Sequence, residues 1–131
     1  MSAPYQLVHY ALHGEKALLP KPGHTAWAYV RDVAQAVVSL LECENRRYVY
    51  HACSIYPFSM LDFAQELSKY FPGFEAEVCD DPSLANVHFF SQKDNGLFDM
   101  EGVRADSGFV PEYNLEKAVA DYVLWLKKNR R

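Results

Sequence analysis

Nine residues, 33–41, constrain the fold of this chain more than any other segment, because all of them except Gln35 and Ser39 are apolar. Gln35 and Ser39 lie four positions apart, so a helix would place both on one narrow face. A surface helix of a small domain needs only one apolar stripe, whereas this segment needs cover on most sides. It therefore predicts a helix, begun by Asp32 as N-cap, that packs against a larger body than 131 residues provide.

The other hydrophobic patterns alternate between helical and extended periods along the chain. Helices are expected where an apolar stripe follows or precedes a capping signal: the pair Ser59 and Asp62 opens one, and Asn114 opens the last. The expected helices cover 4–13, 33–41, 59–71 and the region from 115 onward, and the expected strands cover 27–30, 47–53 and 75–79, with a short extended piece in 16–23. About four helices and three to four short strands predict one small α/β domain, residues 1–131.

Composition excludes several classes of protein. A net charge of -4 argues against a protein that grips nucleic acid, and no apolar run approaches the length of a membrane span. Three cysteines without a Cys-x-x-Cys motif, and the lack of a secretory signal after Met1, indicate a reduced thiol state and a cytoplasmic protein.

Motifs for catalysis, metals and cofactors are weak. No two of the six glycines lie within five residues of each other, so neither a dinucleotide fingerprint nor a P-loop can form. His9 and His13 have helical i, i+4 spacing, but no third metal ligand accompanies them, and a solvated helix face explains both. Tyr113 and Lys117 have Tyr-x-x-x-Lys spacing, which we interpret as coincidence because the tyrosine precedes a helix N-cap.

Five segments, in order, resemble the extended short-chain dehydrogenase/reductases, the NAD-dependent epimerase/dehydratase proteins. GHTAWAYVRDVAQAVVSLL (23–41) is similar to the family pattern G-x-x-x-x-[FW]-V-[HY]-V-x-D-[VL]-A-x-A. RYVYHAC (47–53), followed by Ser59, is similar to x-Y-N-x-G … S, and SMLDFAQELSKYF (59–71) to s-x-x-E-L-x-x-x-[IL]. FDMEGVRADSGFVP (98–111) resembles D-x-S-K-A-x-x-x-L-G-[FW]-x-P, and YVLWLKKN (122–129) resembles the closing helix.

The resemblance implies the C-terminal, substrate-binding portion of such an enzyme. The family carries its glycine fingerprint, its catalytic Ser/Thr and its Tyr-x-x-x-Lys in an N-terminal half, and the chain starts where that half would end. The expectation is a portion without catalytic residues or cofactor of its own, inactive alone, while a complete enzyme would transfer hydride to and from NAD or NADP. The apolar helix would then pack on the cofactor domain, and the chain alone could form a homodimer through it. Two alternatives stay open: a free-standing binding or oligomerisation module with this fold, and an unrelated metal- or ligand-binding domain.

The resemblance also bears on substrate. Thr25 and Ala26 stand where nucleotide-sugar epimerases usually carry Arg-Asp, so the small-molecule substrate is either a nucleotide sugar or another hydroxy or keto compound. Epimerisation, dehydration and reduction all remain open as the reaction. The residues expected to contact substrate come from matched motifs and from the variable loop 80–95: Trp27, Tyr29, Arg31, His88, Lys93 and Arg104. Core packing is the competing interpretation for Trp27 and Tyr29, and a solvated surface position for the others.

Overall fold

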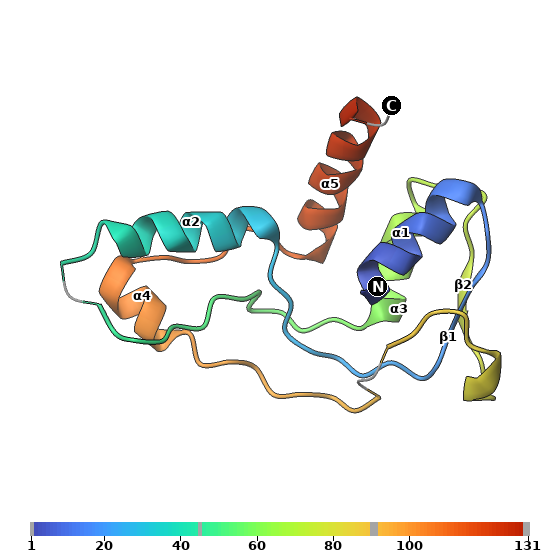
Figure 1. Cartoon of the computed structure of the whole chain (residues 1–131), viewed down its shortest axis with the longest axis horizontal. Helices are drawn as coiled ribbons and strands as arrows, with labels where there is room; N and C mark the ends of the chain where they lie inside the picture. Colours follow the sequence, from blue (N-terminus) through green and yellow to red (C-terminus); the bar gives the residue numbers. More distant parts are fainter. Residues whose placement is uncertain (1, 45, 90–91, 130–131) are drawn as a thin grey trace.

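A computed structural model describes residues 2–44, 46–89 and 92–129. The described residues form five α-helices, one 3-10 turn and a two-stranded sheet, which confirms the predicted α/β class. The elements are α1 (Ala3–His13), β1 (Ala17–Leu19), α2 (Val30–Leu41), α3 (Met60–Ser68), β2 (Ala76–Val78), η1 (Pro82–Leu84), α4 (Glu101–Ser107) and α5 (Leu115–Asn129). They divide into a body, which holds α1, α3, α5 and the sheet, and an arm, which holds α2 and α4 (Figure 1).

The body is held by one apolar core to which α1, α3 and α5 each contribute a face. Leu7, Leu67 and Val123 are among its fully buried side chains, one from each helix. Local sequence starts and stops these helices: Gly14 ends α1 with a left-handed φ of 66°, and its N–H donates to the carbonyl of Ala11. At the start of α3, Ser59 and Asp62 form the reciprocal capping box that their spacing predicts.

The sheet consists of β1 and β2, paired in parallel with Ala17 opposite Ala76 and Leu19 opposite Val78. Ala17 and Leu19 are fully buried, and α3 covers β2, so the sheet closes the outer end of the body. A crossover through α2 and α3 separates the two strands, as parallel pairing requires.

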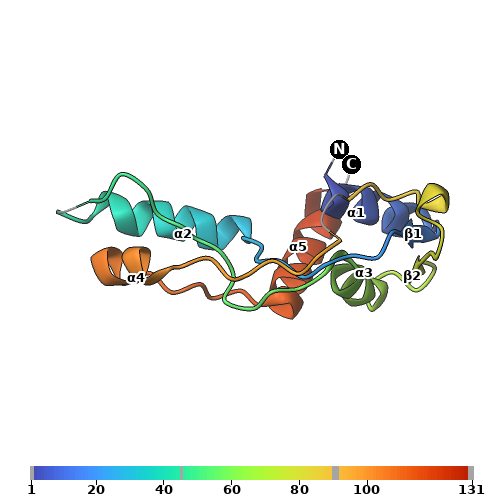
Figure 2. The same ribbon diagram turned by 90° about the horizontal axis from the view of Figure 1, so that it is seen from below.

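The arm has a small core of its own. Ala36 of α2 is buried against Val103 of α4 and against Phe109. The extended segment 46–53 packs on this core through Tyr50 and Ala52, and its Arg47 guanidinium pairs with the carboxylate of Asp106 at 2.8 Å. Figure 2 shows α2 and α4 side by side, projecting away from the body.

Most of α2 has no cover, although its sequence is apolar. Val30, Val37 and Leu41 expose 69%, 52% and 63% of their surface, and Asp32 and Ala36 are its buried residues. The sequence predicted an apolar helix that needs cover on most sides. The structure has this helix, and the described residues leave most of its apolar face uncovered.

Three expectations about local structure were wrong. Segments 27–30 and 47–53 are not strands: their backbone is extended, but among the described residues no strand runs beside them, and a strand forms only where a neighbour accepts and donates its hydrogen bonds. Asp32 is not the N-cap of α2, because the helix begins at Val30 and the carboxylate faces another segment. The short helix α4 was not predicted at all. By contrast, the helices near 4–13, 59–71 and 115 onward and the strand within 75–79 are confirmed.

Gly23 offers a test of how the loop 92–97 is held on the body. A Cβ atom at Gly23 would overlap the backbone carbonyl group of Lys93, whereas a Cβ at Gly96 would meet nothing within 4 Å. Gly23→Ala should therefore lower the free energy of unfolding by about 2 kcal/mol, and Gly96→Ala should leave it almost unchanged. Urea unfolding of both variants checks this, and equal stability of the two would contradict the packing of the loop on Gly23.

Candidate substrate-binding site

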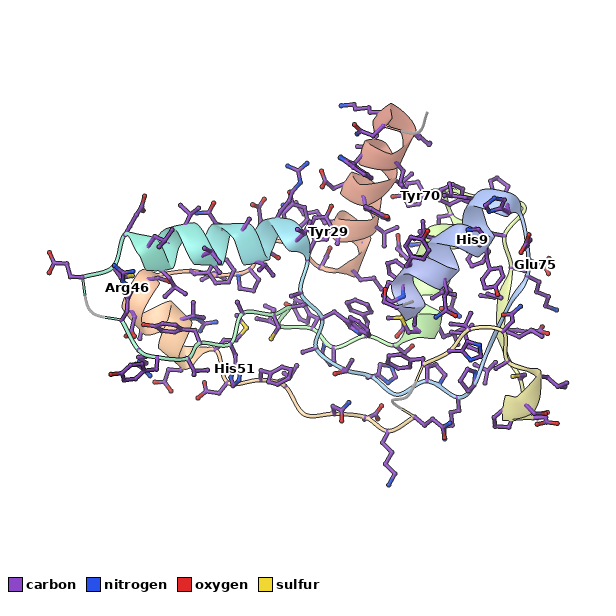
Figure 3. The ribbon with its side chains drawn as sticks, viewed as in Figure 1. His9, Tyr29, Arg46, His51, Tyr70 and Glu75 are labelled. Atoms are coloured by element: carbon purple, nitrogen blue, oxygen red, sulfur yellow. The ribbon has the colours of Figure 1, made fainter. Side chains whose placement is uncertain are left out.

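The start of α2 meets α5 in a polar cluster centred on Asp121. The Tyr29 hydroxyl donates to the Asp121 carboxylate at 2.6 Å, and the Arg31 guanidinium lies 2.7 Å from the same oxygen. Figure 3 shows Tyr29 where the arm leaves the body, beside α5. The Tyr29 hydroxyl and the Arg31 charge hold the pKa of Asp121 below its ordinary value. Burial and the hydrogen bond to Asp121 raise the pKa of Tyr29 to about 12, so this phenol remains neutral.

A second contact ties the same turn of α2 to the segment that precedes α5. The carboxylate of Asp32, which is 6% exposed, accepts hydrogen bonds from the backbone N–H groups of Glu112 and Tyr113, at 2.9 and 3.1 Å. The rings of Tyr29 and Tyr113 lie against each other with centroids 4.7 Å apart. Asp32 thus has a structural role, as expected, but it joins two segments instead of capping a helix.

Between these contacts and α1 lies a hollow of about 340 Å³ with an aromatic lining. Trp27 lines it, stacked on Phe58 with centroids 5.9 Å apart, and its indole N–H donates to the Phe58 carbonyl at 3.2 Å. Tyr29 and Tyr113 line it from the arm side, and Tyr122 from α5. Trp27 and Tyr29 therefore combine the two roles considered for them: both pack on neighbouring residues and both border a cavity.

The six residues expected to contact substrate do not converge on one site. Trp27, Tyr29 and Arg31 come together at the junction of arm and body. Arg104 lies on α4 and borders a separate hollow of about 670 Å³ beside Phe98. His88 and Lys93 are exposed and do not line the aromatic hollow, as the structure describes it.

Sequence reasoning missed two members of the junction, Tyr113 and Asp121. Tyr113 drew notice only for its spacing to Lys117; in the structure that lysine lies 5.0 Å from the centre of the Tyr113 ring and pairs with Glu112. Asp121 carries no sequence signal, because its partner Tyr29 lies 92 positions away.

The described ranges contain no group of three or more His, Cys, Asp or Glu side chains that could hold a metal ion. His13 donates from Nδ1 to the His9 carbonyl at 2.8 Å. A dinucleotide phosphate needs clustered glycines leading into a helix, and α2 is preceded instead by Trp27, Ala28 and Tyr29. Within 2–44, 46–89 and 92–129, no helix is both long and apolar enough to cross a bilayer.

Comparisons of sequence found neither a matching family model nor a matching curated protein. Comparison of structure found many. A partial consensus L-threonine 3-dehydrogenase matches 97% of this chain with a TM-score of 0.71 at 23% identity. The GalE-like L-threonine dehydrogenase of Cupriavidus necator matches 92%, with 0.68 at 24%. The dTDP-glucose 4,6-dehydratase of Bacillus anthracis, solved with NAD, matches 98%, with 0.71 at 17%.

The fold is that of the C-terminal portion of an extended short-chain dehydrogenase. The chain spans about two fifths of the length of the solved chains that it matches: 42%, 44% and 40% for these three. Both the fold class and the resemblance of the sequence segments are thereby confirmed at the level of fold. In those solved chains, the matched portion is part of a larger fold.

The Asp121 cluster predicts a dependence of stability on pH. Since the pKa of Asp121 is lower in the folded than in the unfolded chain, its contribution is complete well above the ordinary value of 3.8 and is lost progressively over the interval in which the pH falls through the lowered pKa. Asp121→Asn should therefore lose less stability than the unchanged chain over this interval. The control Asp80→Asn, at an exposed position, should keep the original profile. Urea midpoints measured across the interval check this, and parallel profiles for Asp121→Asn and the unchanged chain would contradict it.

Proposed function

We propose that this chain is the substrate-binding portion of an NAD(P)-dependent epimerase, dehydratase or reductase. The observation that carries the proposal is the structural match: almost the whole chain superposes on about two fifths of enzymes of this class, some of them solved with NAD. The body, with its aromatic hollow, would shape one wall of the substrate pocket. The sequence has no glycine cluster that could cradle a phosphate, so the proposal gives the chain binding and orientation rather than chemistry.

The arm supports a second part of the proposal, namely that α2 and segment 47–53 pack on the dinucleotide-binding portion of the fold. Val33, Val37 and Val38 leave an exposed apolar row on α2, and Tyr48 and Val49 are exposed on the segment that follows. An apolar helix face beside an extended, unpaired backbone fits the edge of a sheet that carries helices on its faces. A dinucleotide-binding portion would supply such a sheet in the doubly wound pattern.

Titration of the purified chain with NAD and NADP tests whether this chain binds the cofactor by itself. Since the glycine turn that holds the cofactor phosphates is not among its residues, we expect no saturable heat of binding and no hydride transfer.

Reading the DNA upstream of the Met1 codon, over roughly 200 codons, completes the test. An open frame with a glycine fingerprint and a Tyr-x-x-x-Lys supports the proposal, and the assays then move to the whole protein. Turnover by the chain alone would contradict it, and a stop codon just upstream would favour a free-standing binding module.

Self-association of the chain tests the role of the α2 face. Exposed apolar surface of this kind drives association in water, so we expect the purified chain to form dimers that dissociate on dilution. Val37→Asp places a charge in the apolar row and should shift the chain to monomer, with the dissociation constant raised about tenfold or more. Gln35→Asp adds the same charge at an exposed polar position of the same helix and should have little effect. Sedimentation velocity over a dilution series checks this; a monomer throughout, or equal effects of both variants, would contradict it.

A further inference from the structure

The aromatic hollow at the junction of arm and body differs from the rest of the surface in its charge. None of the described residues that line it is an Asp, Glu, Lys, Arg or His. The cations beside it are paired: Arg31 lies 2.7 Å from Asp121, and Lys117, 5.0 Å from the centre of the Tyr113 ring, pairs with Glu112. The polar side chains among its described lining residues are neutral, among them Tyr113 and Asn114. A chain of net charge -4 thus holds a hollow with uncharged walls.

Such walls select against phosphate. A diphosphate needs compensating donors, which proteins supply as Arg or Lys side chains or as a helix N-terminus with free N–H groups. No Arg or Lys is among the described lining residues, and the nearby cations Arg31 and Lys117 are held by Asp121 and Glu112. The first residues of α1, α2 and α5 are the remaining donors at the wall. A phosphate placed in this hollow would therefore lose hydration without an unpaired cation among the described lining residues to compensate, which is costly for a charged group.

The walls suit an uncharged ring or branched aliphatic group. Seven lining residues are aromatic, and rings of this kind gain most from a partner that can stack or meet an edge. A volume of about 340 Å³ is at the lower end of small-molecule sites, which fits a compact ligand and not a nucleotide joined to a sugar.

From this geometry we infer that the hollow binds the apolar part of a small, uncharged hydroxy or keto compound and excludes nucleotide sugars. This inference rests on the proposed function, because only that proposal makes the bound compound a substrate. Of the two substrate classes named above, nucleotide sugars and other hydroxy or keto compounds, it selects the second. Trp27, Phe58 and Tyr122 form the walls against which the ring or aliphatic group packs.

Binding can be measured on the purified chain with Trp27 as reporter. The chain has two tryptophans, and Trp125→Phe leaves Trp27 alone while keeping a ring beside Tyr122. In this background we would titrate 4-phenylbutan-2-one, a neutral aromatic ketone, and UDP-glucose. The ketone should change the fluorescence of Trp27 saturably and bind about tenfold or more tightly than UDP-glucose.

Variants locate the site. Ala118→Phe fills the hollow from α5 and should weaken ketone binding about tenfold, whereas Ala120→Phe, on the same helix but outside the hollow, should not. If Ala118→Phe fails to fold, Tyr122→Leu removes one aromatic wall without adding bulk and should weaken binding several-fold.

Three results would overturn the inference. UDP-glucose could bind as tightly as the ketone; the folded chain could show no saturable ketone binding; or binding could survive Ala118→Phe and be lost in Val37→Asp, which would place the ketone on α2. None of these depends on the cofactor titration or on the upstream DNA. A failed ketone assay beside a successful cofactor-domain assignment would therefore reject only the substrate class.

Discussion

One buried carboxylate determines how the two parts of this molecule are joined. Asp32 accepts the backbone N–H groups of Glu112 and Tyr113, so the first turn of α2 is fixed to the segment that leads into α5. Two partly buried backbone N–H groups would lose their acceptor if this group were removed, and a typical hydrogen bond contributes about 1 kcal/mol to stability. The positions of Tyr29, Arg31 and the aromatic hollow all follow from that attachment, because each lies within one turn of Asp32 or packs against Tyr113.

The arm leaves much of the apolar surface of α2 exposed to water. Its own core, around Ala36, Val103 and Phe109, is small, and it buries only one side of α2. The other side retains Val37 and Leu41 in contact with water, against the apolar driving force that closes the body. This exposure, beside an extended backbone that no described strand pairs with, is the observation behind the proposal that the arm packs on a larger sheet.

The parts of this fold that were predictable are those whose signals are local. Two helix starts were predictable because a cap involves only three or four neighbouring residues: Ser59 and Asp62 begin α3, and Asn114 begins α5. Segment 47–53 has the β-branched and aromatic content of a strand, yet a strand is defined by pairing, and its partner is not among the described residues. Helix α4 contains a glycine and contributes a single buried side chain, Val103, so it shows no apolar stripe. The role of Asp121 could not be predicted from the sequence, because its contacts join positions some 90 residues apart.

The electrostatics of the junction connect the stability of the fold with its choice of ligand. The carboxylate that accepts the Tyr29 hydrogen bond also pairs with Arg31, which follows the lining residue Val30 in the sequence. For the binding inferred above, a substrate phosphate would have to compete with Asp121 for this guanidinium and would break a contact between arm and body. An uncharged ligand would leave the ion pair intact and gain the aromatic contacts of Trp27 and Tyr113. The side chains that hold the start of α2 beside α5 would then also favour a neutral ligand over a nucleotide sugar.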